Sequence, residues 1–295
     1  MPTARLSNVM IAYEVDGDLS DPPIVLIHGL GRQLIEWDPL LVGRIVSAGY
    51  SVVRLDNRDV GESSHLAEKV ALGEIRRALE AGDEVAVPYR LEDMAADVVG
   101  LLDHLGIEAA PVVGVSMGGM IGQTLAIETP GRVRSLTSIM SSTGDWEVGV
   151  PDAEGMRALF HAPPPDGERA VDTILETRRM LATEGTFDEE AERTLVTAAI
   201  NRSFDPAGVG RQLAAIWASG DRTERLRSLD VPTLVVHGAA DQLVALSGGE
   251  ATAAAIPRAR LLVVDGMGHD LPCLHWDRIL GVLLTFLAAN AGRVC

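Results

Sequence analysis

The apolar positions along the chain form short continuous runs, separated by longer segments in which they recur at helical spacing. The runs have the length of strands and end in glycine or polar residues. They cover residues 24–27, 51–55, 111–115, 133–140, 233–236 and 261–264. Such runs are typical of strands buried on both faces of a parallel sheet. Looser alternation over residues 5–15 predicts an antiparallel hairpin at one edge of that sheet.

Helical segments lie between the runs. Apolar residues recur at spacings of three and four over residues 91–105, and Gly106 ends this helix. Residues 116–128 form a second predicted helix, which Pro130 closes. The apolar stretch 279–290 is too short to span a bilayer and predicts a buried helix. Strands that alternate with helices predict the α/β class, with a doubly wound, mostly parallel sheet.

The alternation of strand and helix stops between residues 144 and 225. This segment is rich in arginine, glutamate and alanine, has helical spacing, and contains three consecutive prolines at 163–165. We predict a helical cap over residues 144–225, inserted between two parts of the core at 1–143 and 226–295. A second excursion at 66–89 is charged and rich in turn residues, which predicts a loop or a short helix on the surface.

The strongest chemical signal is the Gly-x-Ser-x-Gly pattern at residues 114–118, which follows a predicted strand and opens a predicted helix. A strand that turns into a helix within one residue leaves Ser116 at the apex with its hydroxyl exposed, and the glycines permit the close backbone approach. The alternative is a purely structural turn. The context of strand and helix favours Ser116 as a nucleophile.

A serine nucleophile needs a base and an orienting carboxylate, which follow it along the chain in this architecture. His269 lies in a glycine-rich turn directly after the last predicted strand, whereas His275 is better explained as a packed residue at a helix start. Asp241 follows the preceding strand and is the predicted acid. Asp145, after the strand at 133–140, is the alternative acid, and Asp270 is expected to point elsewhere.

The tetrahedral intermediate of acyl transfer also needs hydrogen-bond donors for its oxyanion. The backbone N–H of Met117 lies at the start of the helix that follows Ser116, where the helix dipole adds positive charge. The second donor is expected from the loop at 28–31, where Leu30 is the best placed. His28 precedes the nucleophile in the chain, so we expect it to shape this loop rather than to act as the base.

The predicted cap contains five of the few aromatic residues of the chain, namely Trp146, Phe160, Phe187, Phe204 and Trp217. They pack the cap interior or, for one or two of them, line an apolar substrate pocket. Trp146 and Trp217 are the candidates for such a pocket.

Composition removes several other functions. A formal charge of −17 disfavours nucleic acids and anionic membrane surfaces as partners. The two cysteines, Cys273 and Cys295, indicate no disulfide scaffold and a reducing compartment, so we expect a soluble, cytoplasmic protein. The histidines lack metal-ligand spacing, Lys69 is the only lysine, and no dinucleotide fingerprint follows Gly31. No metal or organic cofactor is expected, and nothing in the pattern indicates an oligomeric state.

These motifs resemble those of α/β-hydrolase fold serine hydrolases, in the esterase and lipase-like group that includes aclacinomycin methylesterase and related carboxylesterases. The matching stretches are residues 28–31, 55–63, 114–119, the loop around Asp241, and 265–272. They cover both parts of the core, whereas the cap shares with the family only its helical character and no motif. The resemblance implies an α/β-hydrolase fold, Ser116, Asp241 and His269 as the catalytic triad, and Leu30 and Met117 as oxyanion donors.

The sequence therefore predicts a serine carboxylesterase that cleaves a small to medium apolar ester through an acyl-enzyme. Thioesterases, cofactor-free perhydrolases and C–C bond hydrolases use the same triad and stay open as alternatives. Dehalogenases and epoxide hydrolases of this fold carry an aspartate where this chain has Ser116. A ligand-binding receptor without catalysis is a further alternative, although such proteins usually lack a triad member and this chain has all three.

Overall fold

A single eight-stranded sheet forms the centre of the computed structural model, which describes residues 1–164 and 166–290. The strand order is β1-β2-β4-β3-β5-β6-β7-β8. The strands are β1 Thr3–Arg5, β2 Met10–Asp16, β3 Pro23–Ile27, β4 Ser51–Leu55, β5 Ala110–Val115, β6 Val133–Ile139, β7 Thr233–Gly238 and β8 Ala259–Val264. β1 and β2 pair antiparallel, β2 is antiparallel to β4, and the remaining neighbours are parallel. The predicted doubly wound sheet with an edge hairpin is confirmed.

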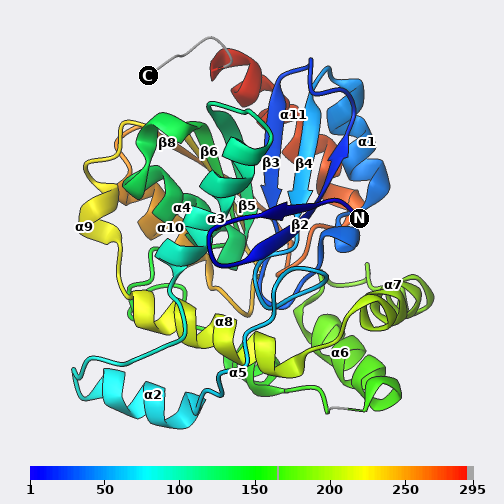
Figure 1. The fold of residues 1–295 in the computed structure, drawn as a ribbon, viewed down its shortest axis with the longest axis vertical. Helices are drawn as coiled ribbons and strands as arrows, with labels where there is room; N and C mark the ends of the chain where they lie inside the picture. Colours follow the sequence, from blue (N-terminus) through cyan, green and yellow to red (C-terminus); the bar gives the residue numbers. More distant parts are fainter. Residues whose placement is uncertain (165, 291–295) are drawn as a thin grey trace.

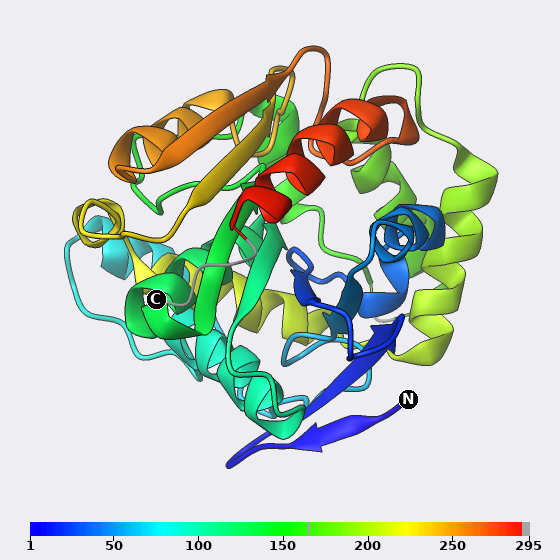
Figure 2. The ribbon, with the colours of Figure 1, turned by 90° about the horizontal axis from the view of Figure 1, so that it is seen from above.

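Helices cover both faces of the sheet because alternate strand residues point to opposite sides. Val25 and Val112 belong to the apolar cluster under one layer of helices, and Leu26 and Val113 belong to the cluster under the other. The first layer contains α3 Leu91–His104, α4 Met117–Glu128 and α10 Leu246–Ala255, and the second contains α1 Pro39–Ser47 and α11 Cys273–Asn290. In Figure 2 the sheet separates α11 and α1 from α3.

The expectation that every run is buried on both faces is wrong for β8. Leu261 in this strand is 38% exposed, and Val282 on the neighbouring α11 is 37% exposed. β8 has a strand neighbour only at β7, so one edge and part of one face meet solvent. α11 is amphipathic rather than buried all round, because one side covers the sheet and the other meets solvent, and its buried side includes Ile279 and Leu283.

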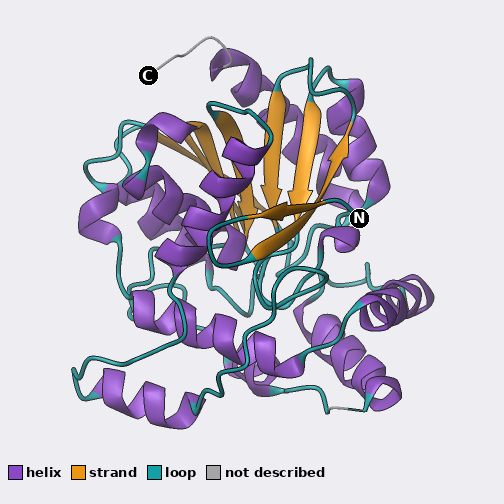
Figure 3. Ribbon diagram, in the orientation of Figure 1, coloured by secondary structure: helices purple, strands orange, loops and turns teal. Residues whose placement is uncertain are grey.

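Most of the chain between β6 and β7 forms helices and loops at the end of the sheet toward which β3 and β4 point (Figures 1 and 3). These helices are α5 Ala153–Phe160, α6 Gly167–Leu181, α7 Glu189–Arg202 and α8 Pro206–Ser219, whereas the short α9 Thr223–Leu226 lies beside the core and packs against α4 and α10. We call residues 144–225 the cap. Its bounds stay a prediction, since the second one falls within α9. Pro165 and Cys295, which entered the sequence argument, lie outside the described residues.

The excursion at 66–89 contains one short helix, α2 Leu72–Glu80, which packs against α8 of the cap. A 3₁₀ turn, η1 Leu34–Glu36, follows the loop after β3. None of the helices within residues 1–164 and 166–290 combines the length and apolar character needed to cross a membrane.

Candidate active site

Ser116 occupies the single residue between β5 and α4, and its backbone is strained. Its φ of 56° and ψ of −120° lie in a region that residues with a side chain rarely adopt. The N–H of Ser116 donates to the Ile139 carbonyl at 2.8 Å, and its carbonyl accepts from the Gly119 N–H at 2.9 Å. Neighbouring structure therefore holds this residue at the carboxyl edge of the sheet, and such strain is concentrated at functional sites.

Close backbone contacts explain the glycines on both sides of Ser116. A Cβ atom at Gly114 would lie 2.1 Å from the Gly118 carbonyl oxygen, and one at Gly118 would lie 2.1 Å from the Ile27 carbonyl oxygen. Gly29 is similarly restricted, because its Cβ would lie 3.2 Å from the Cβ of Ser116. The turn, the end of β3 and the loop at 28–31 thus pack directly on one another.

The three residues of the predicted triad lie in hydrogen-bond contact. His269 Nε2 is 3.1 Å from Ser116 Oγ, and His269 Nδ1 is 2.7 Å from Asp241 Oδ2. A carboxylate only accepts, so Nδ1–H donates to Asp241 and leaves Nε2 as the acceptor for the serine hydroxyl. The loops after β5, β7 and β8 bring these side chains together across up to 153 positions of sequence.

Asp241 is held by its own loop. Its side chain is fully enclosed, and its Oδ1 accepts from the N–H groups of Leu243 at 2.9 Å and Val244 at 2.8 Å. These bonds fix one carboxylate oxygen and leave Oδ2 directed at His269. The arrangement can orient the imidazole and stabilise its protonated form.

His237 is a neighbour of the triad that the sequence argument did not identify. Its Nε2 donates to the Val244 carbonyl at 2.7 Å and lies 3.5 Å from Asp241 Oδ2. Burial lowers the pKa of His237, which favours the neutral ring. Its position four residues before Asp241 at the end of β7 was the available signal. A Cβ at Gly249 would lie only 2.4 Å from His237 Nδ1, which accounts for that glycine.

The loop at 28–31 carries Leu30 beside the turn at Ser116. The N–H of Gly31 donates to Gln212 Oε1 of α8 at 2.9 Å, and Asn57 Nδ2 donates to the His28 carbonyl at 3.1 Å. The side chain of Met117 lies in the apolar core with no exposed surface, so the backbone is the part of Met117 that the oxyanion prediction concerns. The oxyanion role of both amides stays a prediction.

The alternative residues make other contacts. Asp145 Oδ1 accepts from the Glu147 N–H at 2.9 Å, in a turn of its own. His275 lies in the first turn of α11. Asp270 Oδ1 accepts from the N–H and the hydroxyl of Thr183 in the cap. Burial raises the pKa of Asp270, although the two Thr183 bonds oppose that shift.

Three cap aromatics form a cluster. The rings of Trp146 and Trp217 are 6.4 Å apart, and those of Phe160 and Trp217 are 6.2 Å apart. Trp146 is 52% exposed and Phe160 is 45% exposed, so this cluster is not an interior of the cap. Phe187 instead lies under Arg179, whose guanidinium carbon is 5.1 Å from the ring centre.

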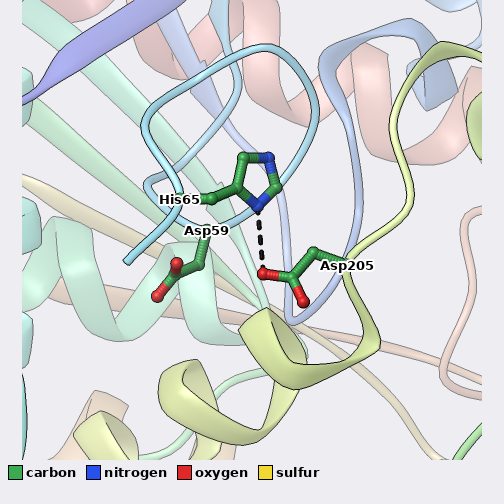
Figure 4. Close-up of side chains that lie close together, drawn as sticks. All are labelled: Asp59, His65 and Asp205. Carbon is green, nitrogen blue, oxygen red and sulfur yellow. Dashed lines mark hydrogen bonds and ion pairs between the residues drawn. The ribbon is translucent and has the colours of Figure 1, made fainter. Parts of the chain in front are cut away.

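Asp59, His65 and Asp205 form the one group among residues 1–164 and 166–290 with ligand atoms close enough for a metal ion (Figure 4). Arg211 of α8 already provides the positive charge there. Its Nη2 lies 2.8 Å from Asp59 Oδ1 and 2.6 Å from Asp205 Oδ2, and the Tyr89 hydroxyl donates to Asp59 Oδ2 at 2.7 Å. We interpret this group as a structural link between the cap and the loop after β4.

Comparison with known proteins agrees with this architecture. Residues 22–275 match the family model described as the alpha/beta hydrolase fold. The chain is 29% identical to rhodomycin D methylesterase DnrP from Streptomyces peucetius, over 92% of this chain and 93% of that protein. It is 30% identical to 2-hydroxymuconate semialdehyde hydrolase from Pseudomonas sp. (strain CF600), over 92% and 89%. The meta-cleavage product hydrolase CumD from Pseudomonas fluorescens IP01 superposes with a TM-score of 0.78 at 22% identity, over 98% of both chains. The chain belongs to the alpha/beta hydrolase fold family, as a hydrolase.

Proposed function

We propose that this protein is a carboxylic ester hydrolase that acts through an acyl-enzyme on Ser116. The observation that carries the proposal is the continuous chain from Ser116 Oγ through the His269 ring to Asp241. A base in hydrogen-bond contact with a serine, and itself oriented by a carboxylate, is the arrangement that activates a hydroxyl nucleophile. The similarity to a protein named as a methylesterase supports an ester as the substrate.

The reaction follows from these positions. His269 Nε2 takes the Ser116 proton as Oγ attacks the ester carbonyl, while the amides of Leu30 and Met117 donate to the oxyanion. The tetrahedral intermediate collapses, and His269 gives the proton to the departing alkoxide. Water then loses a proton to His269 and attacks the acyl group; His269 returns this proton to Ser116 Oγ as the acid is released, which restores the serine. Asp241 stays ionised and stabilises the imidazolium.

The aromatic cluster of Trp146, Phe160 and Trp217 is the proposed contact surface for an apolar part of the substrate. α5, which carries Phe160, begins on the acid loop, because a Cβ at Gly155 would lie 1.9 Å from the Gln242 carbonyl oxygen. α8, which carries Trp217, passes the loop at 28–31 through Gln212. Phe160 and Trp217 thus lie on the two helices that border the site, Trp146 lies in the segment before α5, and the exposed rings of Trp146 and Phe160 favour small to medium apolar esters.

The decisive experiment compares Ser116→Ala with the unchanged protein on a chain-length series of p-nitrophenyl and methyl esters. We expect kcat to fall by several orders of magnitude, because no other group replaces the nucleophile. Ser141→Ala is the matched control, since it removes a buried hydroxyl beside the same turn that has no hydrogen-bond partner among the described residues. Activity of more than a few per cent in Ser116→Ala would contradict the proposal.

C–C bond hydrolysis is the second candidate, favoured by the similarity to 2-hydroxymuconate semialdehyde hydrolase. The same triad serves both reactions, so the products decide between them. Assays of a vinylogous 1,5-diketone, a thioester and a peracid, run beside the esters, compare C–C hydrolase, thioesterase and perhydrolase activity with esterase activity. Turnover of none of them would favour a ligand-binding protein.

A further inference from the structure

We infer that Thr183, a cap residue far from Ser116 in sequence, is a positioning residue for His269, an inference that rests on the proposed function. Thr183 follows α6 and is 5% exposed. Its Oγ1 is 2.9 Å from the N of Gly268 and 2.5 Å from Asp270 Oδ1, and its own N is 3.0 Å from the same carboxylate oxygen. These contacts hold the residues on both sides of His269.

The direction of each hydrogen bond follows from the groups involved. The Gly268 N–H can only donate, and the Asp270 carboxylate can only accept. The Thr183 hydroxyl must therefore accept from Gly268 and donate to Asp270 at the same time. One hydroxyl oxygen can accept one hydrogen bond and donate another, so a serine or threonine fits this position and a valine does not.

The main chain of the cap completes the support. The N–H of His269 donates to the Leu181 carbonyl at 2.8 Å, so three consecutive residues of the histidine loop bind cap residues 181–183. The two backbones are in close contact, because a Cβ at Gly268 would lie 2.7 Å from the Leu181 carbonyl oxygen. The backbone from which the His269 ring projects is thus fixed against the cap.

This support matters because His269 must reach two partners at once. Its ring spans 3.1 Å to Ser116 Oγ and 2.7 Å to Asp241 Oδ2, so a shift of the loop lengthens one or both bonds. Displacement of a catalytic group by about 1 Å can lower the rate about 100-fold. The cap then contributes to the reaction directly, because it holds His269 at hydrogen-bond distance from Ser116.

The test is Thr183→Val, which keeps the shape and removes the hydroxyl, compared with Thr183→Ser, which keeps the hydroxyl. We expect Thr183→Val to lower kcat by about 10–100-fold, the loss expected when a catalytic side chain shifts by up to about 1 Å. KM should change by less than about threefold, because Thr183 acts through His269 and not on substrate. Thr183→Ser should restore kcat to within about threefold of the unchanged protein.

Further variants separate positioning from general damage. Thr186→Val removes a hydroxyl from the same loop that donates only to the Thr183 carbonyl, and should leave kcat within about twofold. Asp270→Ala should also lower kcat, and the double variant should lose less than the two single losses combined, because both changes remove the bond between the Thr183 hydroxyl and Asp270. Should Thr183→Val fail to fold, Asp270→Ala and Thr183→Ser test the same link.

Unchanged kcat in Thr183→Val, or an equal loss in Thr183→Ser, would overturn the inference. These outcomes differ from failure of the proposed function. If Ser116→Ala stays active, the acyl-enzyme proposal is wrong whatever Thr183 does. If Ser116→Ala is inactive and Thr183→Val is fully active, only the positioning role is wrong.

Discussion

The core and the cap are stabilised by different interactions. In the core, two large apolar clusters pack on the two faces of the sheet, and most residues of β3 to β7 are fully buried. The described part of the cap has an apolar cluster with only three buried members, Val171, Leu175 and Val196. Ala215 of α8 belongs to the apolar cluster of the core, and polar links join the cap to core loops, among them Arg178 to Glu36, Arg202 to Asp56 and Arg211 to Asp59.

This difference shows how a cap with little interior of its own stays in place. Other links end on the loops that form the candidate site: Gln212 binds Gly31, and Thr183 binds Gly268 and Asp270. These contacts attach the cap and at the same time fix part of the geometry of the site. The core has no room for a Cβ atom at the glycines beside Ser116, whereas the cap is held in place largely by polar pairs.

The largest expected effect on stability is seen when a glycine is replaced by alanine in the core, and the same replacement in the cap is its control. Gly118→Ala places a Cβ 2.1 Å from the Ile27 carbonyl oxygen, where backbone must move, and should destabilise the protein by about 3 kcal/mol or more while abolishing turnover. Gly210→Ala in α8 meets only ordinary contacts at 3.6 Å and beyond, and should stabilise by about 0.5–1 kcal/mol. Urea denaturation of both variants checks this. Equal effects of the two changes would contradict the contrast between core and cap.

The same contrast explains what sequence alone could predict. The runs at 51–55 and 111–115 became β4 and β5 with bounds within one residue, because a buried strand is a local pattern. Gly106 has a φ of 68° and ends α3, and Gly114 and Gly118 lie where the backbone turns, as expected. The contact of Ser116, His269 and Asp241 could be predicted because the chain order of strands fixes which loops meet at the carboxyl edge.

The rest depends on contacts that no local pattern contains. Arg178 pairs with a glutamate 142 positions away, and Thr183 binds Asp270 across 87 positions. In a chain with 23% charged residues, many such pairings are compatible with the sequence. The exposure of β8 has the same origin, because a strand at an edge and a strand at the centre read alike until the strand order is known.

The second expected effect concerns the link between Arg178 of α6 and Glu36 of η1. The Glu36 side chain is 2% exposed. Burial alone would raise its pKa, but Arg178 and Arg32 outweigh burial and hold the pKa at about 2. Arg178→Met leaves a buried carboxylate with Arg32 as its remaining cation, and should destabilise the protein by about 3 kcal/mol.

Glu36→Gln in the Arg178→Met background is the matched rescue, because it removes the buried carboxylate that has lost one of its two arginine partners and keeps the size. We expect urea denaturation at pH 7 to show recovery of most of the lost stability. A loss below about 1 kcal/mol in Arg178→Met would mean that this pair behaves like an exposed surface pair. The cap would then be attached mainly by its apolar contacts.

The smallest expected effect is a pH dependence of stability that comes from His28, on the core side of the contact between Arg178 and Glu36. His28 is largely enclosed, with its ring 4.6 Å from that of Trp37, and burial followed by repulsion from Arg32 lowers its pKa to about 3. The unfolded chain binds a proton near pH 6.5, so between pH 6.5 and 3 it holds more protons than the folded protein and stability falls as pH falls. From pH 7 to pH 5 this contributes a loss of about 1–2 kcal/mol. His28→Asn removes the titrating ring, so its urea stability should fall by that much less over the same interval. Parallel curves of stability against pH for the two proteins would show that His28 is protonated as easily in the folded protein as in the unfolded chain. Water would then reach the His28 ring in the folded state.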